Sequence, residues 1–441
     1  MKKITMMGVG YVGLVSGTGL ADFGNEVICV DIDPEKIEKL NHGILPIYEP
    51  GLLDLVKKNV EKGRLSFTTD LKKAVNETDV VFLALPTPSG ENGEVDLSYV
   101  FTAIDQIAEI IDSYKVIVTK STVAVGTGDK IRDRLIKAKV SRKMFDVVSN
   151  PEFLREGSAV GDFMRPDRVV IGTDSEKALN NMKEIYRPLY LLETPIVATD
   201  IHTAEMIKYA SNAFLATKIS FINEIANICE LVGADIQTVS KAMGLDGRIG
   251  KKFLHAGPGF GGSCFPKDTL ALTKIAENAG TRATIVEAVI EVNRKQKEKI
   301  VEKLLKFVPD LNGRTIGILG LAFKPNTDDV RDAPALTVIR EILNRGGQIK
   351  AYDPEAMNEM RKHFPEITYV ASSIDAVKGA DALIILTEWN EFRNIDLDLI
   401  KTVIKKPVLI DARNIYDPKT VIEKGFWYDC IGRKIENMKV V

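Results

Sequence analysis

The sequence predicts an α/β protein with two doubly wound parallel-sheet domains joined by a central domain of long helices. Residues 4–33 run in the order strand, glycine-rich turn, helix and strand, which is the first unit of such a sheet. A similar strand pattern returns from Thr315 onward, and two long helical patterns lie between them. Because 441 residues are too many for one compact core, we expect domains at 1–198, 199–308 and 309–441.

A glycine motif follows the first predicted strand. Ile4–Met7 form an apolar run, and a helical pattern ends near Phe23. Between them, Gly8, Gly10 and Gly13 have the G-x-G-x-x-G spacing. Gly8 permits a tight turn, Gly10 lets the backbone approach a pyrophosphate, and Gly13 lets the helix pack closely on the sheet. A purely structural turn is the alternative, but the preceding strand favours dinucleotide binding.

The second predicted strand, 26–30, ends at Asp31. A carboxylate at this position can accept hydrogen bonds from the ribose diol of a dinucleotide. It would also repel a 2′-phosphate. The sequence therefore predicts NAD, not NADP, as the cofactor.

Three further apolar runs predict buried parallel strands at 80–85, 116–118 and 145–148. Polar residues follow each run, at 86–89, 120–122 and 150–152. Ligands of open α/β sheets collect at the carboxyl ends of the strands, so we expect these loops to line a site. Each Ser or Thr taken alone could instead cap a helix.

Two long helical patterns occupy the middle of the chain. Residues 203–232 carry a recurring apolar face that includes Ala204, Ile207 and Phe214, and a second pattern spans about 283–307. Helices of this length between two sheet domains are typical of a spine or a dimer face.

The last third repeats the first and predicts a second Rossmann-like domain. Its glycine loop, 320–324, lacks the three-glycine spacing, so we expect it to bind something other than a second dinucleotide. Lys324, Arg331 and Arg413 lie at predicted loop positions and suit phosphate or sugar contacts. A solvated surface charge is the alternative for each of them.

The segment 261–268, GGSCFPKD, places Cys264 between a glycine-rich loop and a predicted helix. Pro266 fits the first turn of that helix, so the positive end of the helix dipole should lie near the sulfur. Lys267 adds a second positive charge, and both effects would lower the pKa of the thiol and make it a nucleophile. A buried, inert cysteine is the alternative. The flanking glycines, which leave backbone amides open for a ligand, favour the nucleophile.

Charge and cysteine content exclude several classes of protein. A net charge of −2 gives no basis for binding nucleic acid or a charged membrane surface. The four cysteines are widely spaced, with no CxxC and no histidine cluster, which argues against a disulfide framework and a metal site. They suit a reducing, cytoplasmic location, and no apolar run reaches the roughly 18 residues that span a bilayer. The expected partners are small molecules and further copies of the chain.

Two more segments complete a family pattern: NPEFLREG at 150–157 and KYASNA at 208–213. With the motifs above, they make the chain resemble the nucleotide-sugar 6-dehydrogenases. The resemblance extends from the first glycine motif to Arg413, and GFGGSCFPKD at 259–268 is its most specific part. The stretch 248–254 is most similar to the UDP-glucose branch of that family.

The resemblance implies oxidation of the C6 alcohol of UDP-glucose to a carboxylate, with two hydride transfers to two NAD molecules. Cys264 would trap the aldehyde as a thiohemiacetal, and the second oxidation would give a thioester that water hydrolyses. Lys208 and Asn212, four residues apart on one helical face, would stabilise an oxyanion. Asp268 and Glu152 would orient or deprotonate water.

The resemblance also implies binding roles. Thr122 would position the catalytic water. Contacts to NAD are implied for Gly8, Gly10, Tyr11, Val12, Gly13, Asp31, Lys36, Thr87, Thr122, Glu156, Lys267 and Arg331. Contacts to the UDP-sugar substrate are implied for Glu152, Phe153, Leu154, Lys208, Asn212, Arg248, Phe253, His255, Gly259, Phe260, Gly261, Lys324 and Arg413. Arg248 would reach the substrate across a dimer interface, so we expect a homodimer or a larger homo-oligomer. No metal is expected.

Two other functions stay open. A sister dehydrogenase acting on GDP-mannose or UDP-N-acetyl-mannosamine would differ only in pocket contacts that one sequence does not resolve. A non-catalytic NAD-binding scaffold would have no chemical need for Cys264, Lys208, Asn212 and Asp268 together, which argues against it.

Overall fold

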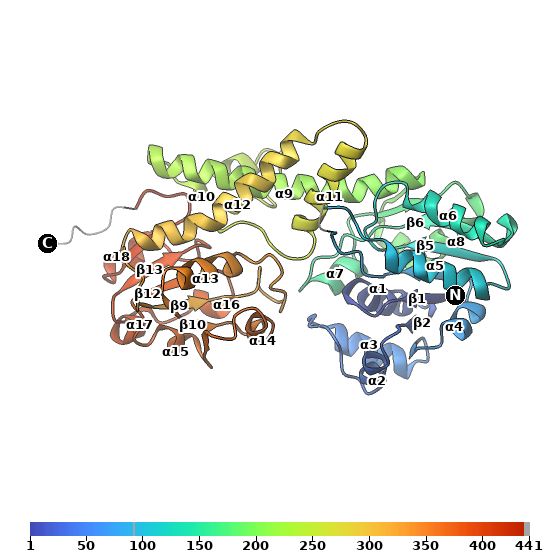
Figure 1. Ribbon diagram of the computed structural model, residues 1–441, viewed down its shortest axis with the longest axis horizontal. Helices are drawn as coiled ribbons and strands as arrows, with labels where there is room; N and C mark the ends of the chain where they lie inside the picture. Colours follow the sequence, from blue (N-terminus) through green and yellow to red (C-terminus); the bar gives the residue numbers. More distant parts are fainter. Residues whose placement is uncertain (91–92, 436–441) are drawn as a thin grey trace. The chain divides into compact units, whose positions relative to one another are not determined.

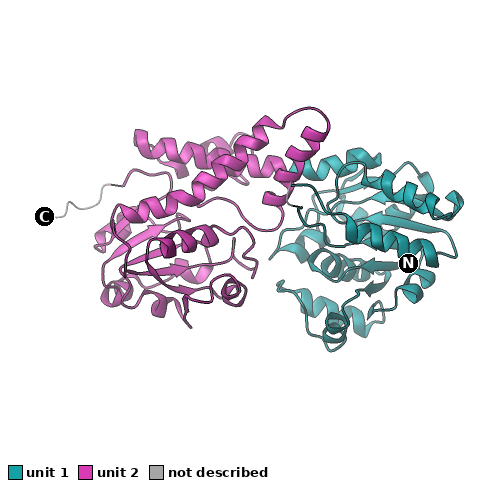
Figure 2. Cartoon of the chain, in the orientation of Figure 1, with its two compact units in different colours: residues 1–211 teal, residues 212–441 magenta. Residues whose placement is uncertain are grey.

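The chain forms two compact units, unit 1 (residues 1–211) and unit 2 (residues 212–441), coloured teal and magenta in Figure 2. The computed structural model describes residues 1–90 and 93–435. The division into three domains, with boundaries after residues 198 and 308, stays a prediction.

Unit 1 is built on one eight-stranded sheet, in the blue to green part of Figure 1. Its strand order is β3-β2-β1-β4-β5-β6-β7-β8, and neighbouring strands are parallel except for β6 and β7. The first six strands have the order of a doubly wound dinucleotide-binding sheet, as predicted. The strands are β1 (Lys3–Met7), β2 (Glu26–Val30), β3 (Leu65–Thr68), β4 (Val80–Leu83), β5 (Lys115–Thr119), β6 (Phe145–Ser149), β7 (Val169–Gly172) and β8 (Ile196–Thr199).

Strands β3, β7 and β8 are not among the predicted ones. Each is four residues long, as is β4, which was predicted from the longer apolar run at 80–85. The sheet therefore continues past β6 by an antiparallel step that the expectation of a parallel sheet did not include.

Helices cover both faces of this sheet because successive strand residues point to opposite sides. Val80 and Phe82 of β4 share a core with α1, α2, α3, α7 and α8, whereas Val81 and Leu83 share a second core with α4, α5 and α6. The helices are α1 (Tyr11–Asp22), α2 (Pro34–Asn41), α3 (Leu52–Glu61), α4 (Leu71–Glu77), α5 (Ser98–Ile110), α6 (Thr127–Lys137), α7 (Ala159–Met164) and α8 (Glu176–Ile185), with 3₁₀ helices η1 (Arg142–Met144) and η2 (Arg187–Leu192).

Unit 2 contains the second doubly wound sheet that the last third of the sequence predicts. Its six strands are all parallel, in the order β11-β10-β9-β12-β13-β14. This is the order of the first six strands of unit 1. The strands are β9 (Thr315–Leu319), β10 (Gln348–Tyr352), β11 (Thr368–Tyr369), β12 (Ala382–Ile385), β13 (Val408–Asp411) and β14 (Trp427–Cys430).

The predicted long helices are confirmed to within two residues at each end. They are α9 (Ile201–Val232), which contains the boundary between the units, and α12 (Thr284–Leu305). In unit 2, α9, α10, α12, α13 and α14 contribute to the core on one side of the sheet, and α15 to α18 contribute to the other. The remaining helices are α10 (Ile236–Gly244), α11 (Phe265–Asn278), α13 (Pro334–Asn344), α14 (Met357–Arg361), α15 (Ser373–Val377), α16 (Asn390–Arg393), α17 (Leu397–Val403) and α18 (Pro418–Glu423).

Within the described part of the chain, no helix combines the length and the apolar composition that crossing a bilayer requires.

Candidate active site

The glycine turn of unit 1 joins β1 to α1, and its three glycines have different environments. A Cβ on Gly8 would lie 2.4 Å from the carbonyl oxygen of Ala84, and a Cβ on Gly13 would lie 2.0 Å from that of Gly8. A Cβ on Gly10 would meet no protein atom within 4 Å. Packing thus explains Gly8 and Gly13, whereas Gly10 borders open space where a ligand can approach.

This turn fits the pyrophosphate of a dinucleotide. Gly10 is the N-cap of α1, and no side chain caps the helix there. The first N–H groups of an α-helix have no carbonyl partner inside the helix, and its N-terminus favours negative charge. The residues present therefore offer phosphate oxygens both donors and a favourable field.

Asp31 follows β2 and is partly exposed. Its Oδ2 accepts a hydrogen bond from the N–H of Val9 at 2.9 Å, and its Oδ1 accepts one from the N–H of Asp33 at 3.1 Å. These bonds fix the carboxylate beside the glycine turn. Each carboxylate oxygen has a further lone pair for a ribose hydroxyl.

Glu49 is a buried residue of this region that the sequence analysis missed. Its carboxylate accepts hydrogen bonds from the hydroxyl of Tyr11 and from the N–H groups of Gly157 and Ala159, at 2.7 and 2.8 Å for the two N–H groups. Burial and this carboxylate raise the pKa of Tyr11. The loop that carries Glu156 is thereby held next to the start of α1. Glu49 comes from a segment without helix or strand periodicity, so no pattern in the sequence predicted it.

The other predicted cofactor residues of unit 1 lie in loops or at helix starts. Thr87 and Thr122 follow β4 and β5, respectively, and both are partly exposed. Lys36 is in the first turn of α2, and its Nζ lies 3.8 Å from Asp33 Oδ2.

Glu152 and Lys208 form a buried ion pair in unit 1. Lys208 Nζ lies 3.0 Å from Glu152 Oε1 and donates to the Glu152 carbonyl oxygen at 2.7 Å. The N–H of Leu154 donates to the other carboxylate oxygen. Burial pushes the pKa of Glu152 upward, but Lys208 and the Leu154 N–H outweigh it and hold the pKa below its usual value. Glu152 is therefore ionised near neutral pH.

Phe153 lies beside this pair. The guanidinium of Arg168 lies 3.5 Å from the centre of the Phe153 ring, and Lys208 Nζ lies 5.3 Å from it. Cation–π contacts of this kind fix the aromatic ring next to the Lys208 ammonium. The sequence analysis did not single out Arg168.

Cys264 is the N-cap of α11 in unit 2, and Pro266 stands in the first turn, both as predicted. The thiol is partly exposed, whereas Cys29, Cys229 and Cys430 are buried. Burial raises the pKa of Cys29 and of Cys430 to about 12 and also raises that of Cys229. Among the four cysteines, Cys264 alone combines access with a helix N-terminus, which is the setting of a reactive thiol.

Asp268, one turn after Cys264, is the centre of a polar cluster. It is 1% exposed. Its Oδ2 accepts a hydrogen bond from Asn212 Nδ2 at 2.6 Å, and its Oδ1 lies 2.8 Å from Lys267 Nζ. Lys267 is thus paired with Asp268, and its effect on the Cys264 thiol stays a prediction. The Asn212 amide nitrogen carries two hydrogens, and this bond uses one of them.

The glycines before Cys264 pack against protein, and for Gly262 the structure corrects the expectation that these glycines leave their amides open. A Cβ on Gly261 would lie 2.4 Å from the Asp332 carbonyl oxygen, and one on Gly262 would lie 2.8 Å from the Phe323 ring. The Gly262 N–H donates to the Arg331 carbonyl oxygen at 2.7 Å. These glycines are therefore required for the close approach of two loops of unit 2.

Arg331 and Arg413 lie in loops of unit 2, as predicted. The Arg331 side chain donates from Nε and Nη2 to Asp329 at 2.8 and 2.9 Å, and it is 63% exposed. Arg413 donates to the carbonyl oxygens of Leu386 and Phe323, both at 2.7 Å. A Cβ on Gly257 would lie 3.6 Å from Arg413 Nη1, so Arg413 borders the predicted sugar loop.

Unit 2 also contains the other residues that were predicted to contact the sugar nucleotide. Phe253 and Phe260 both contact the Phe265 ring edge-on, with centroids 6.1 and 5.9 Å away. Lys324 lies over the Phe323 ring, and His255 is exposed. Arg248 pairs with Asp246, and its side chain is 90% exposed. Asn293, which the sequence analysis missed, fixes the loop by two hydrogen bonds to the Phe260 backbone, of 2.7 and 3.0 Å.

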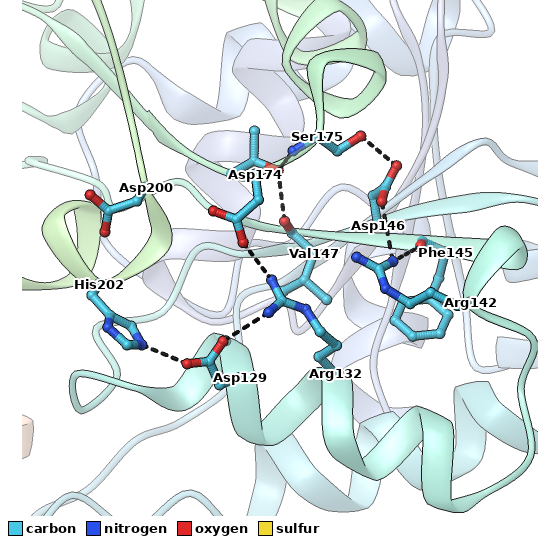
Figure 3. A network of polar contacts seen from close by, with 12 residues as sticks. Asp129, Arg132, Arg142, Phe145, Asp146, Val147, Asp174, Ser175, Asp200 and His202 are labelled. Carbon is cyan, nitrogen blue, oxygen red and sulfur yellow. Dashed lines mark hydrogen bonds and ion pairs between the residues drawn. The ribbon is translucent and has the colours of Figure 1, made fainter.

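His202 belongs to a surface network of unit 1. Its Nε2 lies 2.7 Å from Asp129 Oδ2, and Arg132 joins Asp129 to Asp174 (Figure 3). Both His202 and Asp129 are about half exposed, so this network is a solvent-exposed set of polar contacts that connects α6 to the start of α9. Over the described residues, no group of three His, Cys, Asp or Glu side chains could hold a metal ion.

Comparison with known proteins places the chain in a family. Three domain models of the UDP-glucose/GDP-mannose dehydrogenase family match consecutive segments: the NAD binding domain at 2–190, the central domain at 202–295 and the UDP binding domain at 317–418. The chain belongs to this family. It is therefore an NAD-dependent oxidoreductase, and the resemblance to the nucleotide-sugar 6-dehydrogenases is confirmed.

Close relatives match over nearly the whole length. The UDP-glucose 6-dehydrogenase of Rhizobium meliloti is 53% identical over 98% of this chain and 99% of its own. The UDP-glucose 6-dehydrogenase TuaD of Bacillus subtilis is 52% identical over 98% of this chain and 94% of its own. A solved UDP-glucose dehydrogenase from Pyrobaculum islandicum superimposes with a TM-score of 0.91 at 38% identity, covering 98% of each chain.

Proposed function

We propose that this protein is a UDP-glucose 6-dehydrogenase that oxidises the C6 alcohol of UDP-glucose to a carboxylate with two molecules of NAD. The observation that carries this proposal is Cys264, a partly exposed thiol at the N-terminus of α11, one turn before the buried Asp268–Asn212 pair. A two-step oxidation needs a group that retains the aldehyde between the steps, and a thiol at such a position is suited to that role. The full-length similarity to UDP-glucose 6-dehydrogenases supports this substrate.

The proposed reaction consists of two oxidations and a hydrolysis. In the first oxidation, C6 loses a hydride and its hydroxyl loses a proton, which gives an aldehyde. The Cys264 thiolate adds to the aldehyde carbon, and the resulting alkoxide takes up a proton to give a thiohemiacetal. Loss of a second hydride and a proton gives a thioester. Water then attacks the thioester carbon, the C–S bond breaks, and a carboxylate, the thiolate and two protons are released. Accepting the two hydrides is the chemistry that bound NAD supplies.

The side chains have corresponding roles. Lys208 and the second N–H of Asn212 stabilise negative charge on the C6 oxygen. Asp268 and Glu152 orient or deprotonate water, and Thr122 positions it. Removing one oxyanion donor costs on the order of 3 kcal/mol of transition-state stabilisation. The glycine turn and Asp31 hold NAD, with contacts from Tyr11, Val12, Lys36, Thr87, Glu156, Lys267 and Arg331.

The loop 253–261 of unit 2 is proposed to hold the nucleotide sugar, together with Lys324 and Arg413. The place of Arg413 supports this role: a Cβ on Gly257 would lie 3.6 Å from Arg413 Nη1, and a guanidinium beside a glycine-rich backbone suits a diphosphate. The family resemblance implies further substrate contacts from Phe153 and Leu154.

We also infer a homodimer or a larger homo-oligomer. Phe214, Phe221 and Ile228 of α9 are 65%, 46% and 49% exposed and recur every seven residues, so they share one helical face. Arg248 is proposed to contact the substrate of a second copy. Four cysteines without a disulfide among them support a cytoplasmic location.

The test is a substrate panel with UDP-glucose, GDP-mannose and UDP-N-acetyl-mannosamine. We expect turnover with UDP-glucose and two NADH formed for each sugar consumed. One NADH per sugar, or preference for another nucleotide sugar, would contradict the proposal.

Cys264→Ser tests the nucleophile in the same assay. We expect turnover to be lost while the affinity for NAD, measured by calorimetry, is retained. Cys229→Ala is the matched control, because Cys229 is a buried cysteine with a raised pKa. Full steady-state activity of Cys264→Ser would refute the thioester route.

A further inference from the structure

Three buried amide side chains of unit 2 have no part in the reaction proposed above. Asn223 comes from α9, and Asn293 and Gln296 come from α12. They are 0%, 6% and 1% exposed, respectively. Burying a polar side chain costs free energy unless it forms hydrogen bonds, so the bonds that these side chains make indicate their role.

The three amides bind the backbone of two residues in the loop 253–261. Asn223 Oδ1 accepts a hydrogen bond from the N–H of Gly257, and Gln296 Nε2 donates to the Gly257 carbonyl oxygen, both at 2.8 Å. Asn293 accepts from the N–H of Phe260 at 2.7 Å and donates to its carbonyl oxygen at 3.0 Å. The three side chains thus form an amide clamp that bonds both backbone groups of Gly257 and of Phe260.

The loop has no regular structure that could supply these bonds. Residues 254–261 belong to no helix, strand or hydrogen-bonded turn. Three of them are glycines, which have no side chain that could fix the backbone by packing. The amide clamp therefore supplies the hydrogen-bond partners that a neighbouring strand would supply in a sheet.

Gly259 and Phe260 fit the amide clamp closely. Gly259 has φ of +104°, and a Cβ there would lie 2.8 Å from Asn293 Oδ1, so a larger residue would displace the Asn293 amide. The Phe260 ring is buried in a small core with Ala216 of α9 and Val289 of α12. Phe260 is thus held by its ring and by its backbone, and it anchors the loop.

Stability alone does not account for Asn223. Its Nδ2 is buried and has no hydrogen-bond partner among the described residues. A buried donor without a partner lowers stability, and an apolar side chain would avoid that loss. The asparagine is explained by its oxygen, which fixes the N–H of Gly257.

The amide clamp also fixes Gly257 beside Arg413. A Cβ on Gly257 would lie 3.5 Å from the Ala412 carbonyl oxygen and 3.6 Å from Arg413 Nη1. The Arg413 guanidinium is itself held by hydrogen bonds to two backbone carbonyl oxygens. Two parts of the proposed sugar-nucleotide site are therefore ordered in the protein itself, and an ordered site loses less conformational entropy when a ligand binds.

We propose that Asn223, Asn293 and Gln296 are positioning residues for the nucleotide-sugar substrate, which fix the backbone of Gly257 and Phe260 and so order the loop 253–261 for binding. This inference rests on the proposed function. The three amides act through the loop and are not assigned a contact with the substrate.

The first test compares substrate affinity with cofactor affinity in Asn293→Ala. The change removes both hydrogen bonds to Phe260, so the loop must be ordered when the sugar nucleotide binds. We expect the Kd for UDP-glucose, measured by calorimetry, and its KM to rise about 10-fold. The Kd for NAD should stay unchanged, and kcat should fall by a smaller factor than KM rises. An unchanged Kd for UDP-glucose would overturn the proposal, whatever the loss of kcat or of thermal stability.

Asn25→Ala is the matched control. Asn25 is 4% exposed and makes bonds of the same kinds: its Oδ1 accepts from the N–H of Lys2 at 3.2 Å, and its Nδ2 donates to the Leu20 carbonyl oxygen at 3.0 Å. It precedes β2 in unit 1, at the opposite end of that strand from Asp31. Its loss should lower thermal stability and leave the Kd for UDP-glucose unchanged. A rise of that Kd equal to the one in Asn293→Ala would assign the effect to lost stability and overturn the proposal.

A second measurement depends neither on activity nor on a ligand. Hydrogen bonds to buried acceptors slow the exchange of the Gly257 and Phe260 amide hydrogens with solvent. In Asn293→Ala, the segment 254–262 of the free protein should exchange about 10-fold faster than in the wild type, as followed by mass spectrometry. In Asn25→Ala it should exchange at the wild-type rate.

Exchange at the wild-type rate in Asn293→Ala would refute the hold of the amide clamp on the loop and overturn the proposal. If exchange becomes faster but the wild type does not bind UDP-glucose, the proposed function fails and with it the substrate role, whereas the hold of the amide clamp on the loop stands.

If Asn293→Ala does not fold, Gln296→Met takes its place. Methionine is close to glutamine in size and adapts to its surroundings, so the change removes the bond to the Gly257 carbonyl oxygen with little change in packing. The Kd for UDP-glucose should rise about 3- to 10-fold, with the Kd for NAD unchanged. The same affinity for UDP-glucose as in the wild type would contradict the proposal.

Discussion

The glycine turns of the two units have nearly the same backbone but different surroundings. Gly8 and Gly320 both have φ above +90° and donate to the carbonyl oxygen at the end of the neighbouring strand, at 2.7 and 2.9 Å. Asp31 and Asp353 then accept from the residue after each glycine, at 2.9 and 2.7 Å. Up to this point the second turn is a copy of the first.

The difference begins one residue later. In unit 2, the N–H of Ala322 and the indole N–H of Trp389 also donate to Asp353, both at 3.1 Å, and the carboxylate is fully buried. Asp31 is partly exposed. The helix after Gly8 begins at Tyr11, whereas the helix after Gly320 begins only at Pro334.

A strand, a glycine and an acid are therefore not enough by themselves to predict a dinucleotide site. The Asp353 carboxylate accepts hydrogen bonds from protein donors. In addition, no helix begins directly after this turn, so no helix N-terminus is available there for a pyrophosphate. The prediction that the second glycine loop does not bind a dinucleotide thus gains a structural reason. Four substitutions test the comparison.

The largest effect is expected for Gly13→Ala. Its methyl group would lie 2.0 Å from the Gly8 carbonyl oxygen, so the turn and α1 must move apart. We expect NAD affinity to fall about 100-fold or more and the free energy of unfolding to fall by about 3 kcal/mol. Calorimetry and thermal unfolding measure the two effects. Gly10→Ala is the control, because its methyl group meets no protein atom: it should weaken NAD binding and keep stability.

Gly320→Ala should separate the two turns. Gly320 has φ of +93°, and a Cβ there would lie 2.4 Å from Thr387 Cβ. We expect a loss of about 3 kcal/mol of stability from strain and overpacking, with the Kd for NAD unchanged. A large change in NAD affinity would show that the second turn has a cofactor role after all.

Asp31→Ala should weaken NAD binding about 10- to 100-fold, because a charged acceptor of the ribose hydroxyls is lost. The affinity for UDP-glucose should change little. Unchanged NAD affinity by calorimetry would count against the ribose assignment.

The smallest effect is expected for Trp389→Phe. It removes one hydrogen bond to the buried Asp353, at a cost of about 1–2 kcal/mol in thermal stability. Several donors bind the buried Asp353 carboxylate, and we expect that together they prevent it from binding a dinucleotide. Removing one of these donors should therefore create no second NAD site. A second binding event in calorimetry would show that Trp389 alone blocks it.

Much of the fold follows from local patterns in the sequence. The apolar runs at 80–85 and 145–148 predict buried strands because a parallel sheet buries both faces, and residues 203–232 predict α9 because its apolar face repeats. The strands β3, β7 and β8 were not predicted from such patterns. The three-domain division and the oligomeric state stay predictions.

Local patterns in the sequence were enough to predict the two doubly wound sheets, the glycine turn beside Asp31 and the cysteine at a helix N-terminus. These features depend on the spacing of residues along the chain. The partners of the buried charged groups became known only from the folded chain: Asp268 is paired with Asn212, and Glu152 with Lys208. Burial in a low dielectric makes such charges depend on one another, and residues that meet in this way are far apart in the chain.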